Sequence, residues 1–192
     1  MENRLIAVRL SAQQLSDPRF DDPRALVRWM GAVQAQDYKA VRWAVGIRLR
    51  TASLRAVNRA LERGEILRTH VMRPTWHLVA AEDIRWMLRL SARRIRSANS
   101  SLARSRGLGI DDGMYSRSNR LIEKMLRGNL CLTKRQIADR FQAAGIAADT
   151  HFMTRYLMRA EADGIVCSGP DRAGQFTYAL LEERVAPVSE LT

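Results

Sequence analysis

The segment 130–181 constrains the fold most, because its pattern predicts a helix, a turn, a second helix and a strand hairpin, in this order. Thr133 and Gln136 have the spacing of a capping box, which predicts the N-terminus of the first helix. A second helix is predicted from 150 to 163, and Gly164 predicts its end. Two short apolar runs separated by a polar loop follow and predict the hairpin. This order is typical of winged helix domains, many of which bind DNA.

The predicted helix from 150 to 163 is amphipathic, and its polar side is cationic. At about 100° per residue, its apolar side chains gather on one side. These are Met153, Tyr156, Leu157 and Ala160. His151, Arg155 and Arg159 fall on the opposite side. A helix that lies along a phosphate-lined groove needs such a stripe facing outward, so we expect these three side chains to contact DNA. An ordinary solvated helix face is the alternative.

The N-terminal half repeats this plan less regularly. Asp22 followed by Pro23 predicts the start of a helix, with Asp as N-cap and Pro in the first turn. Ser53 predicts the N-cap of a later helix, and Gly64 predicts the end of that helix. Two apolar segments between 66 and 79 then predict a second hairpin, which resembles another wing.

The fold class that these patterns predict is mainly α with short β-hairpin wings, an α+β fold of tandem winged helix-turn-helix units. The predicted boundaries are a first unit at 1–80, a basic linker helix and loop at 81–112, a second unit at 113–185 and a tail at 186–192. Four tryptophans stand at positions that are periodic for helices or strands, and we expect them in the core: Trp29, Trp43, Trp76 and Trp86.

The chain is strongly basic, and many of its arginines lie between the two predicted units. The formal net charge is +12, which favours a polyanionic partner such as nucleic acid. GC-rich codon usage would explain arginine in place of lysine, but not an uncompensated charge. A long helix is predicted from 81 to 97, followed by a flexible segment rich in Ser and Asn through 105. One face of that helix carries Arg85, Arg89, Arg93 and Arg96. Because like charges at this spacing repel, we expect the stripe to bind DNA phosphates.

No pattern in the sequence predicts a metal, a cofactor or a membrane segment. His70, His77 and His151 are widely spaced and lack partners at zinc-ligand spacing. Phosphate-binding loops and dinucleotide fingerprints are absent from the sequence. Cys131 and Cys167 are expected to be buried free thiols in a reducing compartment. With no signal peptide and no long apolar run, we expect a cytoplasmic, nucleoid-associated protein.

One polar cluster stands in otherwise apolar surroundings, directly after the helix predicted from residue 22. It consists of Gln34, Ala35, Gln36 and Asp37. On a helix, residues i and i+2 point about 200° apart, so the two glutamines can act together only where the chain is extended. Asp37 is a rival candidate, either as a general base or as the N-cap of the next helix. A polar helix end that satisfies backbone groups is the remaining alternative.

Three segments carry a resemblance to a known family: Val33–Asp37, Leu67–Val79 and the segment 130–181. Together they resemble the AlkZ/YcaQ-type winged-helix DNA glycosylases, which release alkylated bases and unhook interstrand crosslinks. The resemblance covers most of the chain. It implies a catalytic Gln-x-Gln element, to which Gln34 and Gln36 correspond. It also implies a hairpin with a Thr-x-His motif beside the DNA, matched by Thr75 and His77. Members of the family continue into a third winged helix, which this sequence does not supply.

An amide suits this chemistry although it is not a base. Glutamine has no proton affinity near neutral pH, but it can orient a water and support an oxocarbenium-like sugar. A base alkylated at N7 is already cationic and leaves neutral, so no strong acid or base is needed. We therefore expect Gln34 and Gln36 to position water at C1′ of an alkylated purine nucleotide. Arg73, at the hairpin bend, is expected to contact the DNA backbone. His77 is explained equally well as a DNA contact or as a core histidine bonded to the backbone.

The leading hypothesis is a winged-helix protein that binds double-stranded DNA and acts on alkylated or crosslinked DNA as a monofunctional glycosylase without a cofactor. The first alternative is a non-enzymatic DNA-binding protein such as a transcriptional regulator, whose DNA binding Gln34→Ala would leave unchanged. The second alternative is a winged-helix protein-interaction module, which would not bind duplex DNA appreciably.

Overall fold

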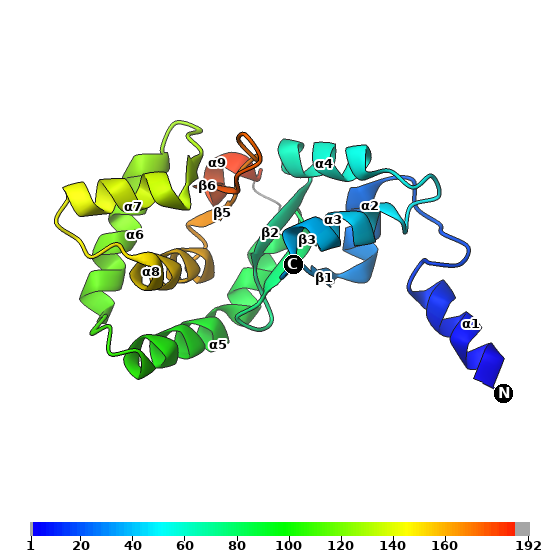
Figure 1. Cartoon of the computed structure of the whole chain (residues 1–192), viewed down its shortest axis with the longest axis horizontal. Helices are drawn as coiled ribbons and strands as arrows, with labels where there is room; N and C mark the ends of the chain where they lie inside the picture. Colours follow the sequence, from blue (N-terminus) through cyan, green and yellow to red (C-terminus); the bar gives the residue numbers. More distant parts are fainter. Residues whose placement is uncertain (1, 187–192) are drawn as a thin grey trace.

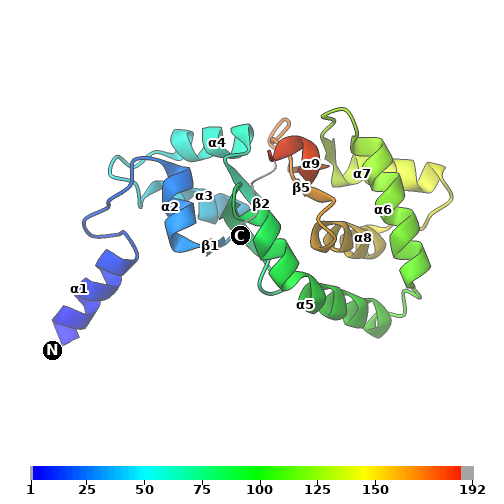
Figure 2. The same ribbon diagram turned by 180° about the vertical axis from the view of Figure 1, so that it is seen from behind.

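Two antiparallel sheets of three strands each organise residues 2–186, the part of the chain that the computed structural model describes (Figure 1). In each unit, helices and the strands of one sheet follow one another in the order of a winged helix. The long helix α5 (Ile84–Ser105) joins the two units. The fold is therefore mainly α with short β-hairpins, which confirms the predicted α+β class. Helix α1 (Glu2–Ala12) projects away from the rest in both views (Figures 1 and 2).

The first unit begins at Asp22, whose carboxylate accepts a hydrogen bond from the Ala25 amide and caps α2 as predicted. Its elements are α2 (Pro23–Met30), β1 (Ala32–Gln34), α3 (Tyr38–Gly46), α4 (Leu54–Arg63), β2 (Ile66–His70) and β3 (Trp76–Ala80). Strand β3 lies between β1 and β2, and both pairings are antiparallel. Ser53 caps α4, and Gly64 ends it with a φ of 74°, a left-handed conformation that glycine adopts without strain.

The second unit repeats this order. Its elements are α6 (Asp112–Leu126), β4 (Leu132–Thr133), α7 (Lys134–Ala143), α8 (Thr150–Ala162), β5 (Val166–Ser168), β6 (Thr177–Leu180) and α9 (Leu181–Arg184). The predicted capping box between Thr133 and Gln136 is present. Phe141 and Tyr156 are fully buried in its core. Of the predicted tail at 186–192, all but the first residue lies outside the described residues.

Helix α5 continues to Ser105, so the prediction of a flexible segment after residue 97 was wrong. Asn99 is fully buried, and its amide donates to the Arg155 carbonyl at 2.9 Å and to the Tyr115 hydroxyl at 3.3 Å. Ala103, one turn later, is also buried. Contacts with α6 and α8 therefore stabilise a helix that the local composition does not favour.

The two faces of the first sheet serve two different cores. Ile66 and Leu78 point into the core of the first unit. Leu67 and Val79, their neighbours on the opposite face, join a cluster formed with α5 and with Cys167 of the second unit. Strand alternation explains this division. The first sheet thus forms the contact between the units.

Polar side chains also cross this contact. The ring of His70 on β2 bonds to the carboxylate of Glu161 on α8, and both side chains are buried. At the other end of β2, Arg184 donates to the carbonyls of Leu61 and Glu62 at 2.8 and 2.9 Å. These bonds join segments that are far apart in the sequence.

Three tryptophans lie at the surface, which corrects their predicted place in the core. Trp29 is 49% exposed, Trp43 62% and Trp86 40%, whereas Trp76 packs against the core of each unit. Helical periodicity did not reveal which side of each helix meets a neighbour.

The cysteines follow their prediction. Cys131 and Cys167 are buried free thiols, and burial raises the pKa of Cys167 to about 12. None of the described helices has the length and apolar content needed to cross a membrane.

Candidate functional site

The polar segment that follows α2 is extended rather than helical. Gly31 ends α2 with a φ of 75°, and β1 then pairs with β3, which places Gln34 opposite His77. The Ala35 amide continues this ladder by donating to a β3 carbonyl at 2.7 Å. Alternation buries Ala35 in the core and leaves Gln34 and Gln36 exposed. The condition under which the two amides can act together is therefore met.

Gln36 and Asp37 are both engaged by backbone amides. The side-chain oxygen of Gln36 accepts a hydrogen bond from the Trp76 amide at 3.2 Å. One oxygen of Asp37 accepts from the amides of Ala40 and Lys39, each at 2.9 Å, which caps α3 and lowers the pKa of the carboxyl. The sequence left open whether Asp37 is a general base or the N-cap of the next helix, and in the structure Asp37 is the N-cap of α3.

His77 lies in a row across the sheet with Gln34 and Thr69. The ring is buried, and its Nδ1 lies 2.9 Å from the carbonyl of Thr75. Because a carbonyl only accepts, Nδ1 carries the proton of the neutral ring and Nε2 keeps its lone pair. Burial lowers the pKa of His77 although the Thr75 carbonyl raises it, and the charge of Arg73 adds to the lowering. A neutral imidazole therefore lies in the strand next to Gln34.

The turn between β2 and β3 lies beside this row. Met72, with a φ of 63°, and Arg73 are exposed at the turn. The hydroxyls of Thr69 and Thr75 are buried and have no hydrogen-bond partner within residues 2–186. The hairpin thus combines an exposed cation with buried hydroxyls next to the two glutamines.

Arg68 holds the glutamine segment from the core side, a contact that sequence reasoning missed. Its Nη2 and Nε donate to the Ala35 carbonyl at 2.8 and 3.1 Å, and Nη2 also reaches the Gln36 carbonyl at 3.3 Å. Three aromatic rings surround the guanidinium, with centroid distances of 4.4 Å to Trp76, 5.0 Å to Tyr38 and 5.4 Å to Phe176. The one signal in the sequence was an arginine in the middle of an apolar strand.

The arginine stripe of α5 is divided in its contacts. Arg89 and Arg93 are exposed, and Arg93 makes no hydrogen bond or ion pair within the described part of the chain. Arg85 is half-buried and donates to the Val185 carbonyl at 3.0 Å. Arg96 pairs with Asp163 at 2.6 Å. Arg85 and Arg96 of the predicted stripe therefore have partners within the protein.

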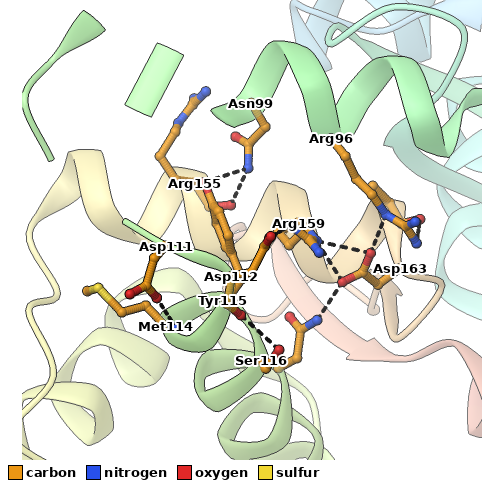
Figure 3. Close-up of polar contacts among 12 residues, drawn as sticks. Arg96, Asn99, Asp111, Asp112, Met114, Tyr115, Ser116, Arg155, Arg159 and Asp163 are labelled. Carbon is orange, nitrogen blue, oxygen red and sulfur yellow. Dashed lines mark hydrogen bonds and ion pairs between the residues drawn. The ribbon is translucent and has the colours of Figure 1, made fainter. Parts of the chain in front are cut away.

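The predicted outward stripe on α8 faces outward only in part, because α8 packs against α5 and α6: His151 is exposed, whereas Arg155 and Arg159 are half-buried. Arg159 pairs with Asp163 at 2.9 Å and with Asp112 at 3.2 Å, and it lies over the ring of Tyr115. Figure 3 shows Arg96 and Arg159 converging on the carboxylate of Asp163. The expectation that Arg159 lies on a free helix face was therefore wrong.

Arg155, one turn earlier, has no such partner. Its Nη1 is buried without a hydrogen bond in the described residues, and in Figure 3 its side chain points away from Asp163. Burial lowers the pKa of Arg155, and the nearby charge of Arg106 adds to this. Arg106 reaches His151 at 2.6 Å, and Lys134 bonds to a hydroxyl on the same turn of α8. Several cations therefore gather around the first turns of α8.

Helix α4 occupies in the first unit the place that α8 has in the second, and one of its faces is open. Arg55, Asn58 and Arg59 are exposed there. The sequence analysis did not select these residues, because it assigned the open face to α8 instead.

Metal ligands do not cluster in the described part of the chain, where no group of three or more His, Cys, Asp or Glu side chains could hold an ion. The polar side chains at the glutamine segment are two amides, one neutral imidazole and the carboxylate of Asp37.

Comparisons with known proteins identify the family of the chain. The model of the family "DNA glycosylase AlkZ-like" matches residues 27–191. Among solved structures, the fold is similar to that of the Streptomyces sahachiroi DNA glycosylase AlkZ, with a TM-score of 0.70 and 22% sequence identity. The alignment covers 95% of this chain and 51% of that chain, so this chain spans about half the length of that structure. No curated protein matches. Because the family model covers most of the sequence, the chain belongs to the AlkZ-like DNA glycosylase family.

Proposed function

We propose that the chain is a monofunctional DNA glycosylase that releases N-alkylated bases from duplex DNA, with Gln34 and Gln36 as its catalytic residues. One observation carries the proposal: both amides stand exposed on an extended segment whose middle residue, Ala35, is anchored in the core. Family membership supports hydrolysis of the glycosidic bond as the reaction. Interstrand crosslinks formed through alkylated bases belong to the same substrate class.

In this mechanism the two amides orient a water toward C1′ while the glycosidic bond breaks. The bonding electrons leave with the base, which departs neutral because alkylation had made it cationic. The sugar acquires positive charge, and amide oxygens stabilise that charge. The oriented water then forms a bond to C1′ and releases one proton to the solvent. Because its pKa is lowered, His77 is neutral and does not repel the positive charge that develops on the sugar.

The DNA backbone is bound, in this proposal, by cations at the hairpin and on the helices. These are Arg73, Arg89, Arg93, His151 and Arg155, with Thr75 and His77 beside the reacting nucleotide. Arg85, Arg96 and Arg159 are bonded within the protein, and we assign them to holding the fold. A duplex DNA substrate supports a location at the nucleoid in the cytoplasm, which is part of this proposal.

The test is base release from a duplex that carries a single N7-methylguanine, measured in single turnover. The double variant Gln34→Ala/Gln36→Ala is expected to lose release by roughly 100-fold or more while DNA affinity is kept. Gln142→Ala, which removes an exposed glutamine on α7, is the matched control and should release at the full rate.

The outcomes separate the hypotheses. Release that survives the double substitution would rule out Gln34 and Gln36 as the catalytic pair. If the unmodified chain releases no base but binds duplex DNA with a steep salt dependence, it is a DNA-binding module. If it does not bind duplex DNA at physiological salt, it is a protein-interaction module. Because the chain spans about half of the AlkZ structure, catalysis by this chain alone is itself part of the proposal.

A further inference from the structure

We infer that Arg68 is a positioning residue for the glutamine pair, and that the hairpin of the second winged helix unit holds Arg68 in place. The inference rests on the proposed function of Gln34 and Gln36, but its geometry does not. Figure 1 shows β5 of the second unit beside β2, which carries Arg68.

The hydrogen bonds of Arg68 go to the one segment that bears both glutamines. Two of its nitrogens donate to the Ala35 carbonyl, between Gln34 and Gln36, and one also donates to the carbonyl of Gln36. Paired donors from a rigid planar group fix both the position and the direction of a carbonyl. The backbone from which the two amides project is therefore held at its midpoint.

Burying this charge is costly, and the surroundings are suited to it. Arg68 is only 9% exposed, and burial lowers its pKa. No carboxylate forms an ion pair with it within residues 2–186. Its charge is stabilised instead by carbonyl oxygens and by the faces of Trp76, Tyr38 and Phe176. Methionine or leucine would fill this space without the cost of burying a charge, so the guanidinium is explained by what it donates to.

The second unit supplies two of the contacts that hold Arg68. Phe176, next to β6, lies against the guanidinium, and it also meets the ring of Trp76 at 5.5 Å. The hydroxyl of Ser168 on β5 accepts a hydrogen bond from the Arg68 amide at 2.8 Å. A displacement of this hairpin would thus move the arginine and, through it, the Ala35 carbonyl.

The experiment compares Arg68→Met with Arg68→Lys and Phe176→Leu. Displacing a catalytic group by about 1 Å can cost roughly 100-fold in rate. We expect Arg68→Met to lower the single-turnover rate constant by at least about 10-fold while the Kd for the lesion duplex changes less than about 2-fold. Arg68→Lys keeps one donor and should recover part of the rate. Phe176→Leu should also lower the rate constant, but by less than Arg68→Met does.

Arg184→Met is the matched control. Arg184 also joins the two units by donating to backbone carbonyls, those of Leu61, Glu62 and Ser168, but it does not contact the glutamine segment. It should lose thermal stability to a similar extent but lose much less rate than Arg68→Met, because it reaches Arg68 only through Ser168. Equal losses of rate in Arg184→Met and Arg68→Met would mean that Arg68 only holds the fold, and the inference would fail.

A second readout does not depend on catalysis. The Ala35 amide is bonded to a β3 carbonyl and should exchange its hydrogen slowly. We expect Arg68→Met to speed this exchange by at least about 10-fold, and Arg184→Met to speed it by much less. Unchanged exchange in Arg68→Met overturns the inference. If the unmodified chain releases no base, the proposed function fails, while this measurement still decides whether Arg68 positions the segment.

Discussion

At the scale of single residues, the two glutamines and the arginine behind them differ in how readily a sequence reveals them. Gln34 and Gln36 stand out because polar side chains interrupt an apolar stretch, and Asp22 and Pro23 predict where the preceding helix begins. Arg68 contacts a carbonyl 33 positions earlier in the chain. No local pattern reports a contact over that separation, so its role becomes visible only in the folded chain.

His77 carries a pH prediction. Its pKa is lowered by burial in the folded chain, whereas the unfolded chain keeps the ordinary value of 6.5. As the pH falls below about 6.5, the unfolded state binds the proton first, so the free energy of unfolding decreases. The decrease for one proton is at most about 1.4 kcal/mol per pH unit.

Urea unfolding between pH 7.5 and 5.5 checks this prediction. The unmodified chain should lose more stability over the range than His77→Gln, which has no group that titrates at this position. A His77→Gln variant that loses as much stability as the unmodified chain would show that the ring is not held neutral.

At the scale of elements, local signals predicted most helices and both hairpins. Caps such as Ser53 and Thr133 act through the nearest amides, so a short stretch of sequence contains the whole interaction. The part of α5 after residue 97 and the direction of the α8 stripe depended on packing between helices. A polar residue such as Asn99 suggests a loop, but its side chain is bonded to Tyr115 and to a carbonyl of α8 within the fold. Composition therefore predicted a loop where tertiary contacts form a helix.

The divided stripe of α5 leads to a prediction about salt. Arg93 is exposed without a partner in the described residues, whereas Arg96 is paired with Asp163. If α5 binds phosphates, Arg93→Gln should reduce the slope of log K against log salt by about 0.9, the value for one phosphate. Arg96→Gln should leave the slope unchanged although it removes the same charge. DNA titrations at several salt concentrations measure both, and equal slopes for the two variants would contradict the assignment.

At the scale of the whole molecule, one carboxylate joins three helices. Asp163 accepts hydrogen bonds from Arg96 of α5 and Arg159 of α8 (Figure 3). It also accepts one from Asn119 of α6. Asp163→Asn keeps the shape but weakens two charge-assisted bonds, and we expect it to lower the free energy of unfolding by about 2 kcal/mol.

Asp139→Asn on α7 is the control for this change, because Asp139 is exposed and makes no ion pair within the described chain. Chemical denaturation of both variants makes the comparison. A loss at Asp163 no larger than that at Asp139 would show that the junction does not depend on the carboxylate.

The bond between His70 and Glu161 also bears on the order in which the chain assembles during synthesis. The two residues are 91 positions apart, so a ribosome releases the first unit well before Glu161 exists to meet it. Until then, the part of the first unit that contacts the second unit exposes apolar side chains, such as Leu67 and Val79, beside the imidazole of His70. N-terminal domains generally fold first during synthesis, and their interdomain surfaces remain exposed until the next domain is complete. This apolar surface of the nascent unit therefore stays exposed until the second unit has been synthesised and covers it.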